Sequence, residues 1–221
     1  MSERINMPGM VKKAGQISAD EMELINAQAL EPLEETQIYK FKIAACNDQI
    51  DRDGERFTEK TLKELAELYV GKTVIFDHEW SAANQTARIY KAYVEEENGV
   101  KNLIVCAYML KAGNESIIAA IDGGILREVS VGCAVKKYIC SICGEDYRTC
   151  MHIRGREYSG ETCVVQLAGA ADAYEVSFVA VPAQPKAGVT KAWSGDQETK
   201  NEAAKAAFEY HKKEIEIMEV K

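Results

Sequence analysis

The feature that most constrains the fold is a series of short β-type segments that fills the middle of the sequence. Residues 87–97 and 102–110 are rich in aliphatic and aromatic side chains, and Asn98-Gly99 between them is a typical two-residue hairpin turn. Further segments of this kind are 37–46, 74–80, 125–140, 163–169 and 174–183. Because strands joined by hairpins pair antiparallel, we expect a mainly antiparallel β core.

Capping signals predict helices beside this core. Ser18 with an acidic residue three positions later is a capping box, and it opens a helical stretch that we expect to include Leu30. Thr58 and Gly71 are typical of residues that begin and end a helix. A short helix is expected over 115–121. A β core with a few flanking helices belongs to the α+β class.

Charge and cysteine content restrict the partners and the compartment. The 221 residues include 27 Lys and Arg against 35 Asp and Glu, which gives a net charge of −8. Because phosphate binding needs clustered cations, we expect no nucleic-acid partner. No apolar run approaches the roughly 20 residues of a membrane helix, and the N-terminal residues lack the apolar core of a secretory signal. Seven cysteines without an export signal favour a reducing, cytosolic compartment.

The composition divides the chain into an arm, a domain and a tail. Residues 1–36 form an N-terminal arm that contains the first helix, and 37–192 form the domain. Within the domain, the cysteine-rich segment 140–163 interrupts the β pattern. Residues 193–221 are rich in Lys, Glu and Ala and predict a charged helical tail.

Three histidines bear on chemistry. His211 lies in the charged tail and is most simply a solvated residue, whereas His152 lies among cysteines and is most simply a metal ligand. His-dependent catalysis then falls on His78, which shares the two-residue period of the 74–80 segment with apolar residues. An imidazole there is either a general base or a core histidine bonded to a backbone carbonyl, and the pattern leaves both open.

Ser130 and Glu175 are the other candidates for catalysis. Val129 and Val131 flank Ser130, so its hydroxyl points to the face opposite theirs, and Gly132 leaves that face open. Ser130 is either a nucleophile or a buried serine bonded to the neighbouring strand. Glu175 is a carboxylate in an apolar strand, where a charge is costly unless an opposite charge, such as an imidazolium, pairs with it.

Four short motifs, taken in order, resemble those of one family. They are Asp51-Arg52-Asp53-Gly54 with Phe57, then Phe76-Asp77-His78, then Val129-Ser130-Val131-Gly132, then Glu175-Val176-Ser177-Phe178-Val179 running into Val181-Pro182-Ala183. In order and spacing, residues 37–192 resemble the prohead maturation proteases of tailed phages, a family related to the herpesvirus assemblins. Each motif is short, so the resemblance depends on the occurrence of all four.

The resemblance implies an assemblin-like, β-barrel-like core and a serine protease triad. Carried over by position, His78 is the general base, Ser130 the nucleophile and Glu175 the third member, with Asp172 a second candidate for the acid. Assemblins have an arginine near the oxyanion shortly after the third member. Residues 182–186 contain none, so we expect backbone N–H groups to bind the oxyanion.

The resemblance also implies a biological role. Family members are endopeptidases that process scaffold segments and the major capsid protein, and also themselves, during procapsid maturation. The implied location is the host cytoplasm, inside the procapsid. The related viral enzymes are active as dimers, which makes a homodimer an expectation that the sequence pattern itself does not address.

The cysteine-rich segment has the spacing of a metal site. Cys140 and Cys143 form a Cys-x2-Cys pair, and Cys150 and His152 follow at i and i+2, where a strand would turn both to one side. A tetrahedral Cys₃His zinc site of knuckle type is expected, with all positions filled by protein and hence structural. Cys163 is an alternative to His152. Free thiols and a redox role are the competing interpretations.

Two other classes of function compete with the protease. One is a non-catalytic, zinc-binding assembly protein that associates with capsid or scaffold. The other is a thiol-dependent enzyme that uses Cys133 or the Cys140/Cys143 pair. The thiol enzyme is disfavoured because Cys133 is out of phase with Ser130 and would face the opposite side of the strand.

Overall fold

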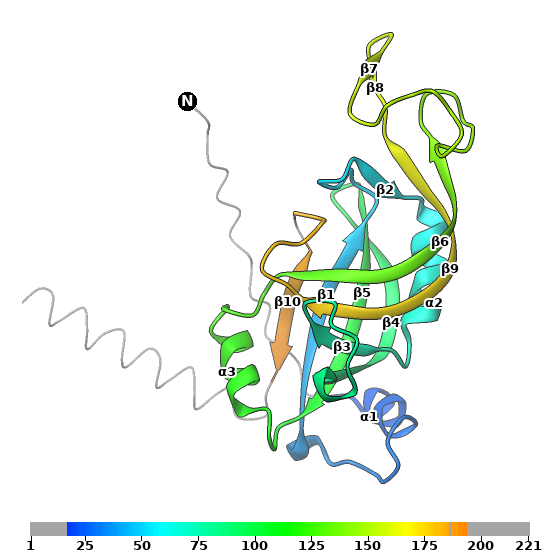
Figure 1. Cartoon of the computed structure of the whole chain (residues 1–221). Helices are drawn as coiled ribbons and strands as arrows, with labels where there is room; N and C mark the ends of the chain where they lie inside the picture. Colours follow the sequence, from blue (N-terminus) through cyan, green and yellow to red (C-terminus); the bar gives the residue numbers. More distant parts are fainter. Residues whose placement is uncertain (1–16, 186, 194–221) are drawn as a thin grey trace, which may run out of the picture.

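The computed structural model of the chain describes residues 17–185 and 187–193 (Figure 1). Within these residues the fold is α+β, as expected, with three α-helices: α1 (Ala19–Asn26), α2 (Glu59–Tyr69) and α3 (Glu115–Asp122). The strands are β1 (Ile38–Asn47), β2 (Glu55–Phe57), β3 (Thr73–Phe76), β4 (Ala87–Glu97), β5 (Val100–Leu110), β6 (Val129–Cys140), β7 (Glu157–Tyr158), β8 (Glu161–Thr162), β9 (Val165–Phe178) and β10 (Gly188–Trp193). The expected tail helix lies outside the described residues. No helix of the described part is long and apolar enough to cross a membrane.

Helix α1 begins as expected and ends early. The Ser18 hydroxyl accepts the Glu21 N–H, and the Glu21 carboxylate accepts the Ser18 N–H, which confirms the capping box. The helix ends at Asn26, and Leu30 is exposed beyond it, so the prediction of a helix that includes Leu30 was wrong. The cause is Asn26, whose side chain exchanges two hydrogen bonds with the backbone of Leu33 and turns the chain back.

Helix α2 follows the predicted signals. The Thr58 hydroxyl accepts the Thr61 N–H, and after the helix Gly71 has a φ of +84°, which glycine adopts without strain. One face of the helix is fully buried through Leu62, Leu65 and Tyr69. Burial of each such side chain contributes about 1.5–3 kcal/mol. This face fixes α2 against the sheet.

The sheet is mixed rather than antiparallel throughout. Its order is β10-β1-β5-β4-β3-β9-β2, and β6 pairs with β9 outside this path. The Asn98-Gly99 hairpin is present, with both residues at positive φ. However, β2 and β3 both run parallel to β9. The chain reaches β3 through a connection that contains α2, and it reaches β9 after the long cysteine-rich segment. Such connections permit parallel pairing, which the sequence pattern of an individual strand does not indicate.

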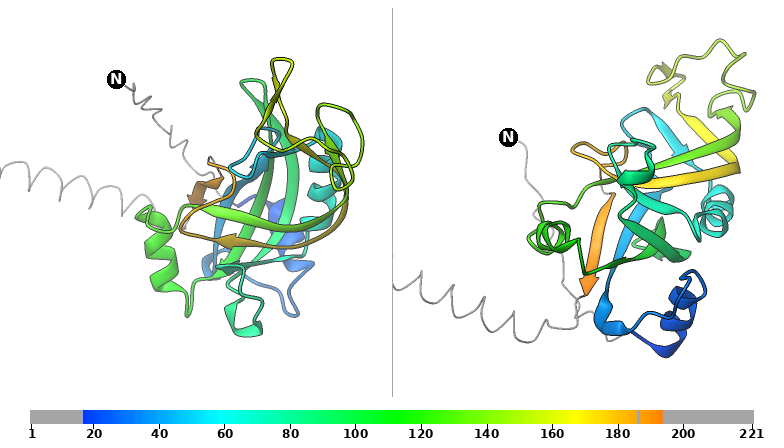
Figure 2. Two further views of the ribbon diagram at one scale, coloured as in Figure 1. Left: turned by 45° about the horizontal axis from the view of Figure 1, so that its top comes forward. Right: turned by 60° about the horizontal axis from the view of Figure 1, so that its bottom comes forward.

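The strands curve around a core without forming a closed barrel among the described residues (Figure 2). β6 runs antiparallel to β9 over its whole length, from Val129 opposite Phe178 to Cys140 opposite Val165. A closed barrel would require the segment before β6 to pair with β10. Among the described residues these two segments share one isolated bridge, between Glu128 and Gly188. Of the expected β-barrel-like core, the structure therefore has the curvature of the sheet but not the closure.

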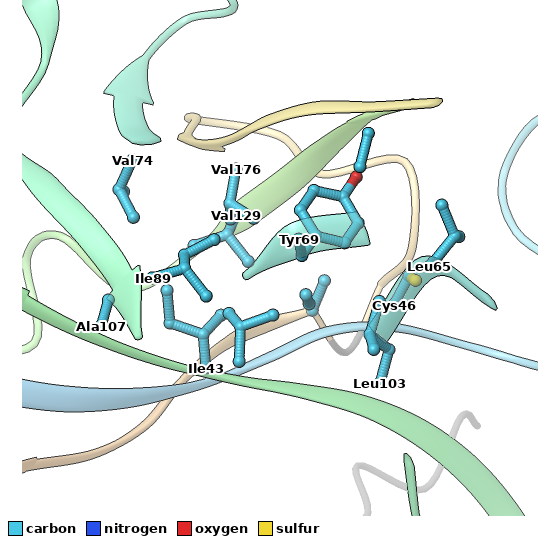
Figure 3. Close-up of a cluster of buried hydrophobic side chains, with 14 of the residues drawn as sticks. Ile43, Cys46, Leu65, Tyr69, Val74, Ile89, Leu103, Ala107, Val129 and Val176 are labelled. Atoms are coloured by element: carbon cyan, nitrogen blue, oxygen red, sulfur yellow. The ribbon is translucent and has the colours of Figure 1, made fainter. Parts of the chain in front are cut away.

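The core lies inside this curved sheet, under α2. Figure 3 shows side chains from α2 and from strands β1, β3, β4, β5, β6 and β9 that point toward one another. Val129 on β6 and Val176 on β9 are fully buried members of this cluster. Because side chains alternate along a strand, burial of these two valines sends their neighbours Ser130, Glu175 and Ser177 to the opposite face. Core packing thus sets the direction of the candidate catalytic residues.

Candidate functional site

His78 lies in a tight turn rather than on a strand. β3 ends at Phe76, and Asp77 and His78 both have left-handed backbone conformations, with φ of 52° and 54°. The period-two argument for the direction of the His78 side chain was therefore wrong. The turn is held by Asn84, whose amide donates to the carbonyls of Phe76 and Glu79 at 2.9 Å. Non-glycine residues in this conformation store strain, which is common at functional sites.

The imidazole of His78 is paired with Glu175. Their Nδ1 and Oε1 atoms are 2.7 Å apart, and the Glu175 side chain is 2% exposed while that of His78 is 42% exposed. A second bond at 2.6 Å runs from the Ser177 hydroxyl to Oε2 of Glu175. An ionised carboxylate only accepts hydrogen bonds, so Nδ1 carries the proton and Nε2 is the free, basic nitrogen.

Ser177 connects the His78 turn to this pair. Its hydroxyl accepts the backbone N–H of His78 at 3.0 Å while it donates to Glu175. Both roles of the hydroxyl are thus used, and the turn is fixed to β9 next to the carboxylate. Ser177 was not among the residues predicted for the site. Its position two residues after Glu175, on the same face of the strand, was the available signal.

Gly132 provides the space for the Glu175 carboxylate. The two residues are opposite each other in the β6–β9 ladder, and a Cβ added to Gly132 would overlap Oε1 and lie 3.0 Å from Cδ of Glu175. The carbonyl of Gly132 accepts a 3.0 Å bond from the Tyr69 hydroxyl, which fixes the strand. The open face that the sequence suggested above Ser130 is therefore filled by the acid. A glycine within a strand commonly marks such a close approach.

Ser130 lies on the same face, one step along the ladder. It is opposite Ser177 and two residues from Gly132, so its side chain shares their side of the sheet. Opposite residues in an antiparallel pair have Cβ atoms about 4.5–5.5 Å apart. Among the described residues, the Ser130 hydroxyl makes no hydrogen bond to His78. The structure thus joins His78 to Glu175 and sets Ser130 beside this pair without direct contact.

Two alternative residues have other partners. Asp172 pairs with Lys72 at 3.5 Å and accepts the N–H of Ala173, so it is not the acid that contacts His78. Burial raises the pKa of Cys133 to about 11, so its thiol is protonated at neutral pH. A protonated thiol is a poor nucleophile, which weighs against the thiol-enzyme interpretation for Cys133.

A pocket of about 200 Å³ borders β6 on its core side, where Val129, Val131 and Cys133, which alternate with Ser130, belong to the lining together with Ser130 itself. Its floor is apolar, with Phe57 and Leu167 among the lining residues. Three carboxylates, those of Asp51, Asp53 and Glu55, belong to one wall. The pocket is large enough for one side chain of a bound peptide.

The four predicted metal ligands lie together. The candidate ligand atoms of Cys140, Cys143, Cys150 and His152 are within 4.8 Å of one another. A tetrahedral zinc site with Zn–S bonds of about 2.3 Å has ligand–ligand distances of about 3.8 Å, so small movements would complete it. Cys163 is outside this set, although its sulfur is 3.8 Å from that of Cys140. The cluster can bind a metal ion such as zinc.

Local turns, not a strand, bring these ligands together. Gly144 closes the Cys-x2-Cys turn by donating its N–H to the Cys140 carbonyl at 2.9 Å, with a φ of +75°. Cys150 lies at the end of a second turn, where its N–H bonds to the Asp146 carbonyl. The expected strand geometry for Cys150 and His152 was therefore wrong, since the two residues lie in a loop.

The chemistry of the ligand atoms fits a metal. Nδ1 of His152 is buried and has no hydrogen-bond partner among the described residues, as expected for an atom reserved for an ion. Burial opposes ionisation of Cys140, but backbone N–H groups of Cys143 and Ile142 lower its pKa to about 6. Burial raises the pKa of Cys163 to about 11. The unpartnered Nδ1 of His152 and its place in the cluster favour His152 over Cys163 as the fourth ligand.

Comparison of the chain with protein-family models, with curated proteins and with solved structures finds no match. The site is therefore defined by its geometry. It consists of a buried carboxylate bonded to an imidazole, a serine on the adjacent strand, and a separate Cys/His cluster that can bind a metal.

Proposed function

We propose that the chain is a serine endopeptidase in which Ser130 is the nucleophile, His78 the general base and Glu175 the residue that orients the base. The observation that carries this proposal is the 2.7 Å bond between Nδ1 of His78 and the buried Oε1 of Glu175. This bond leaves Nε2 as the basic atom, and a carboxylate, imidazole and serine together form the general pattern of acyl-transfer sites.

The reaction follows from these roles. Nε2 of His78 takes the proton of Ser130 while Oγ attacks the carbonyl carbon of a peptide bond. The resulting tetrahedral intermediate collapses, and the departing amine takes the proton from His78. Water then hydrolyses the acyl-serine by the same proton transfers. The buried charge of Glu175 stabilises the imidazolium formed in each half of the reaction, and base catalysis of this kind contributes about 10²–10⁴ in rate.

Closure of Ser130 onto His78 is part of the proposal. His78 is half-exposed in its turn, and catalytic hydrogen bonds are often long without substrate and tighten in the Michaelis complex. The proposal requires the Ser130 side chain to move to Nε2 while the His78–Glu175 bond is kept, and both Ser130 and the His78 turn adjoin Ser177.

We assign the biological setting from the motifs. The motif order of residues 37–192 resembles that of prohead proteases, so the proposed substrates are scaffold segments and the major capsid protein, with the chain itself as a further substrate. The proposed location is the procapsid in the host cytoplasm. A homodimer, as in the related viral enzymes, belongs to the same proposal.

A second candidate is a zinc-binding assembly protein without catalysis. It is favoured by the cysteine-rich loop, which lies at the end of the β6–β9 ribbon away from the core and exposes Met151 and Ile153 (Figure 1). In both candidates the proposed ion is structural zinc, held by Cys140, Cys143, Cys150 and His152. Metal analysis of purified protein should give about one zinc per chain, and absence of metal would remove this part.

The test of the protease is cleavage in trans. Denatured Ser130→Ala chain is incubated with folded wild-type protein, and fragments are identified by mass spectrometry. Folded Ser130→Ala should be slower by about 10⁴-fold or more. Ser116→Ala, in the exposed first turn of α3, is the matched control and should cleave like wild type. Equal cleavage by the Ser130→Ala and wild-type proteins would rule out the assignment of the nucleophile.

A further inference from the structure

One wall of the pocket beside Ser130 is a short acidic turn. The Asp51 carboxylate accepts the backbone N–H groups of Asp53 and Glu55 at 2.9 and 2.8 Å, which closes the turn. Asp51, Asp53 and Glu55 all contribute to the pocket lining. The position of this 51–55 turn therefore determines the shape and charge of the pocket.

The cysteine-rich segment reaches this turn through one side chain. The guanidinium of Arg154 forms an ion pair with Oε1 of Glu55. Between its backbone and Glu55, the Arg154 side chain passes directly over Gly54. A Cβ added to Gly54 would lie 2.9 Å from Cγ and 3.1 Å from Cδ of the arginine. Gly54 also has a φ of +69°. Both facts require glycine at the contact.

Arg154 is placed by the metal cluster. It follows the ligand His152 by two residues, and its backbone N–H bonds to the Tyr147 hydroxyl at 3.1 Å. The neighbouring N–H of Ile153 bonds to the hydroxyl of Tyr158, whose ring packs edge-on against His152 at 4.6 Å. Residues 151–157 are mostly exposed, so apolar burial contributes little to their order. Besides these hydrogen bonds and that from the Gly155 N–H to the Cys163 carbonyl, an ion bound at His152 would add a further constraint on this stretch.

We propose that the cysteine-rich segment is a metal-dependent arm of this pocket, in which a bound metal ion holds Arg154 on Glu55 and thereby adds to the backbone bonds of Arg52 and Gly54 that hold the 51–55 turn. The use of the pocket for substrate rests on the proposed protease function, whereas the coupling between metal and turn does not. Arg154 is a positioning residue in this account, since it acts through Glu55.

The pair also sets the charge of the pocket. Arg154 pairs with Glu55 and also offsets the charge of Asp51, and burial raises the pKa of Glu55 against the effect of this arginine. Loss of the metal would free Arg154 and leave the charges of Glu55 and Asp51, two residues of the pocket lining, without this arginine. Substrate binding would then change more than the chemical step, because the triad residues belong to other parts of the structure.

Hydrogen exchange of the 51–57 peptide tests the coupling without any use of activity. Chelation of zinc from the wild-type protein should speed exchange in this peptide by about two- to fivefold, as loss of one ion pair allows. Arg154→Ala should show the same fast exchange with zinc still bound, and chelation should add nothing. Arg156→Ala, two residues away and without a side-chain partner among the described residues, is the control and should behave like wild type.

Two outcomes would overturn the proposal. One is an unchanged 51–57 peptide after chelation while residues 140–163 exchange faster. The other is an Arg154→Ala protein that exchanges like wild type. Arg154→Lys, which keeps the charge, should restore part of the protection. If cleavage is present, Arg154→Ala should raise KM more than it lowers kcat. Faster exchange of the 51–57 peptide after chelation, in a protein that cleaves no substrate, would support the metal-dependent arm and contradict the proposed protease function.

Discussion

The two ends of the β6–β9 ribbon obtain their order from different sources. At one end, Val129, Val176 and Phe178 are buried in the core, and this packing holds Glu175 in position. At the other end the ribbon leaves the core and carries the cysteine-rich loop, where Met151 and Ile153 are exposed. The comparison teaches that one pair of strands can combine a site built on apolar packing with one that depends on ligand chemistry.

The strongest test of the core end is a cavity in α2. Leu65→Ala removes a fully buried side chain and should lower the free energy of unfolding by about 2–5 kcal/mol in urea. The metal content of the folded protein should stay unchanged. Val181→Ala, at a side chain that is 72% exposed, is the control and should change stability by less than about 0.5 kcal/mol.

Overpacking beside the acid should have the next largest effect. Gly132→Ala places a methyl group where Glu175 lies, and it should cost about 1–3 kcal/mol of stability. It should also disturb the bond to His78, so the loss of activity should exceed what unfolding explains. Wild-type activity and stability in this variant would show that the carboxylate occupies a different position.

Helix α1, in the N-terminal arm, should show a smaller effect on stability that depends on pH. Burial opposes ionisation of Glu21, but bonds from Lys40, the Ser18 N–H and Tyr90 outweigh it and lower the pKa. Its contribution is therefore present at neutral pH and is lost as pH falls below about 4.5 and through the lowered pKa. Glu21→Gln should cost about 1 kcal/mol at pH 7 and less at pH 3. Glu23→Gln, at an exposed residue, is the control. An equal loss of stability in Glu21→Gln at pH 7 and at pH 3 would contradict this account.

The metal end should show the smallest effect on the core. Cys143→Ala should abolish the bound metal and make residues 141–162 sensitive to protease, yet shift the unfolding transition of the core by less than about 1 kcal/mol. Cys163→Ala should keep the metal, because its thiol lies outside the ligand set. Metal loss in Cys163→Ala with retention in His152→Ala would reverse the assignment of the fourth ligand.

The predictable features depend on residues close in sequence. The Ser18 capping box, the Asn98-Gly99 turn and the Cys140–His152 cluster each follow from local chemistry, and the structure contains all three. The parallel pairing of β3 with β9 and the turn at His78 depend on contacts with distant residues. A single sequence does not encode such contacts as a pattern, so these features were missed.

The same limit applies within the candidate site. Ser130 and Glu175 were selected through the order of the four motifs, because the strand pattern alone left Ser130 open, and the need for Gly132 appears only when β6 is set opposite β9. The contact from Arg154 to Glu55 joins residues 99 positions apart and had no signal in sequence. The pairing of His78 with Glu175 was predictable from the motifs, whereas the contacts of Gly132 with Glu175 and of Arg154 with Glu55 were not.

The most direct test of the central claim is covalent labelling with diisopropyl fluorophosphate, followed by intact-mass and peptide analysis. The account predicts one adduct per chain, on Ser130, with labelling much slower in His78→Ala and absent in Ser130→Ala. Labelling of Ser130→Ala at the wild-type rate, or an adduct on Ser130 that forms equally fast without His78, would contradict it.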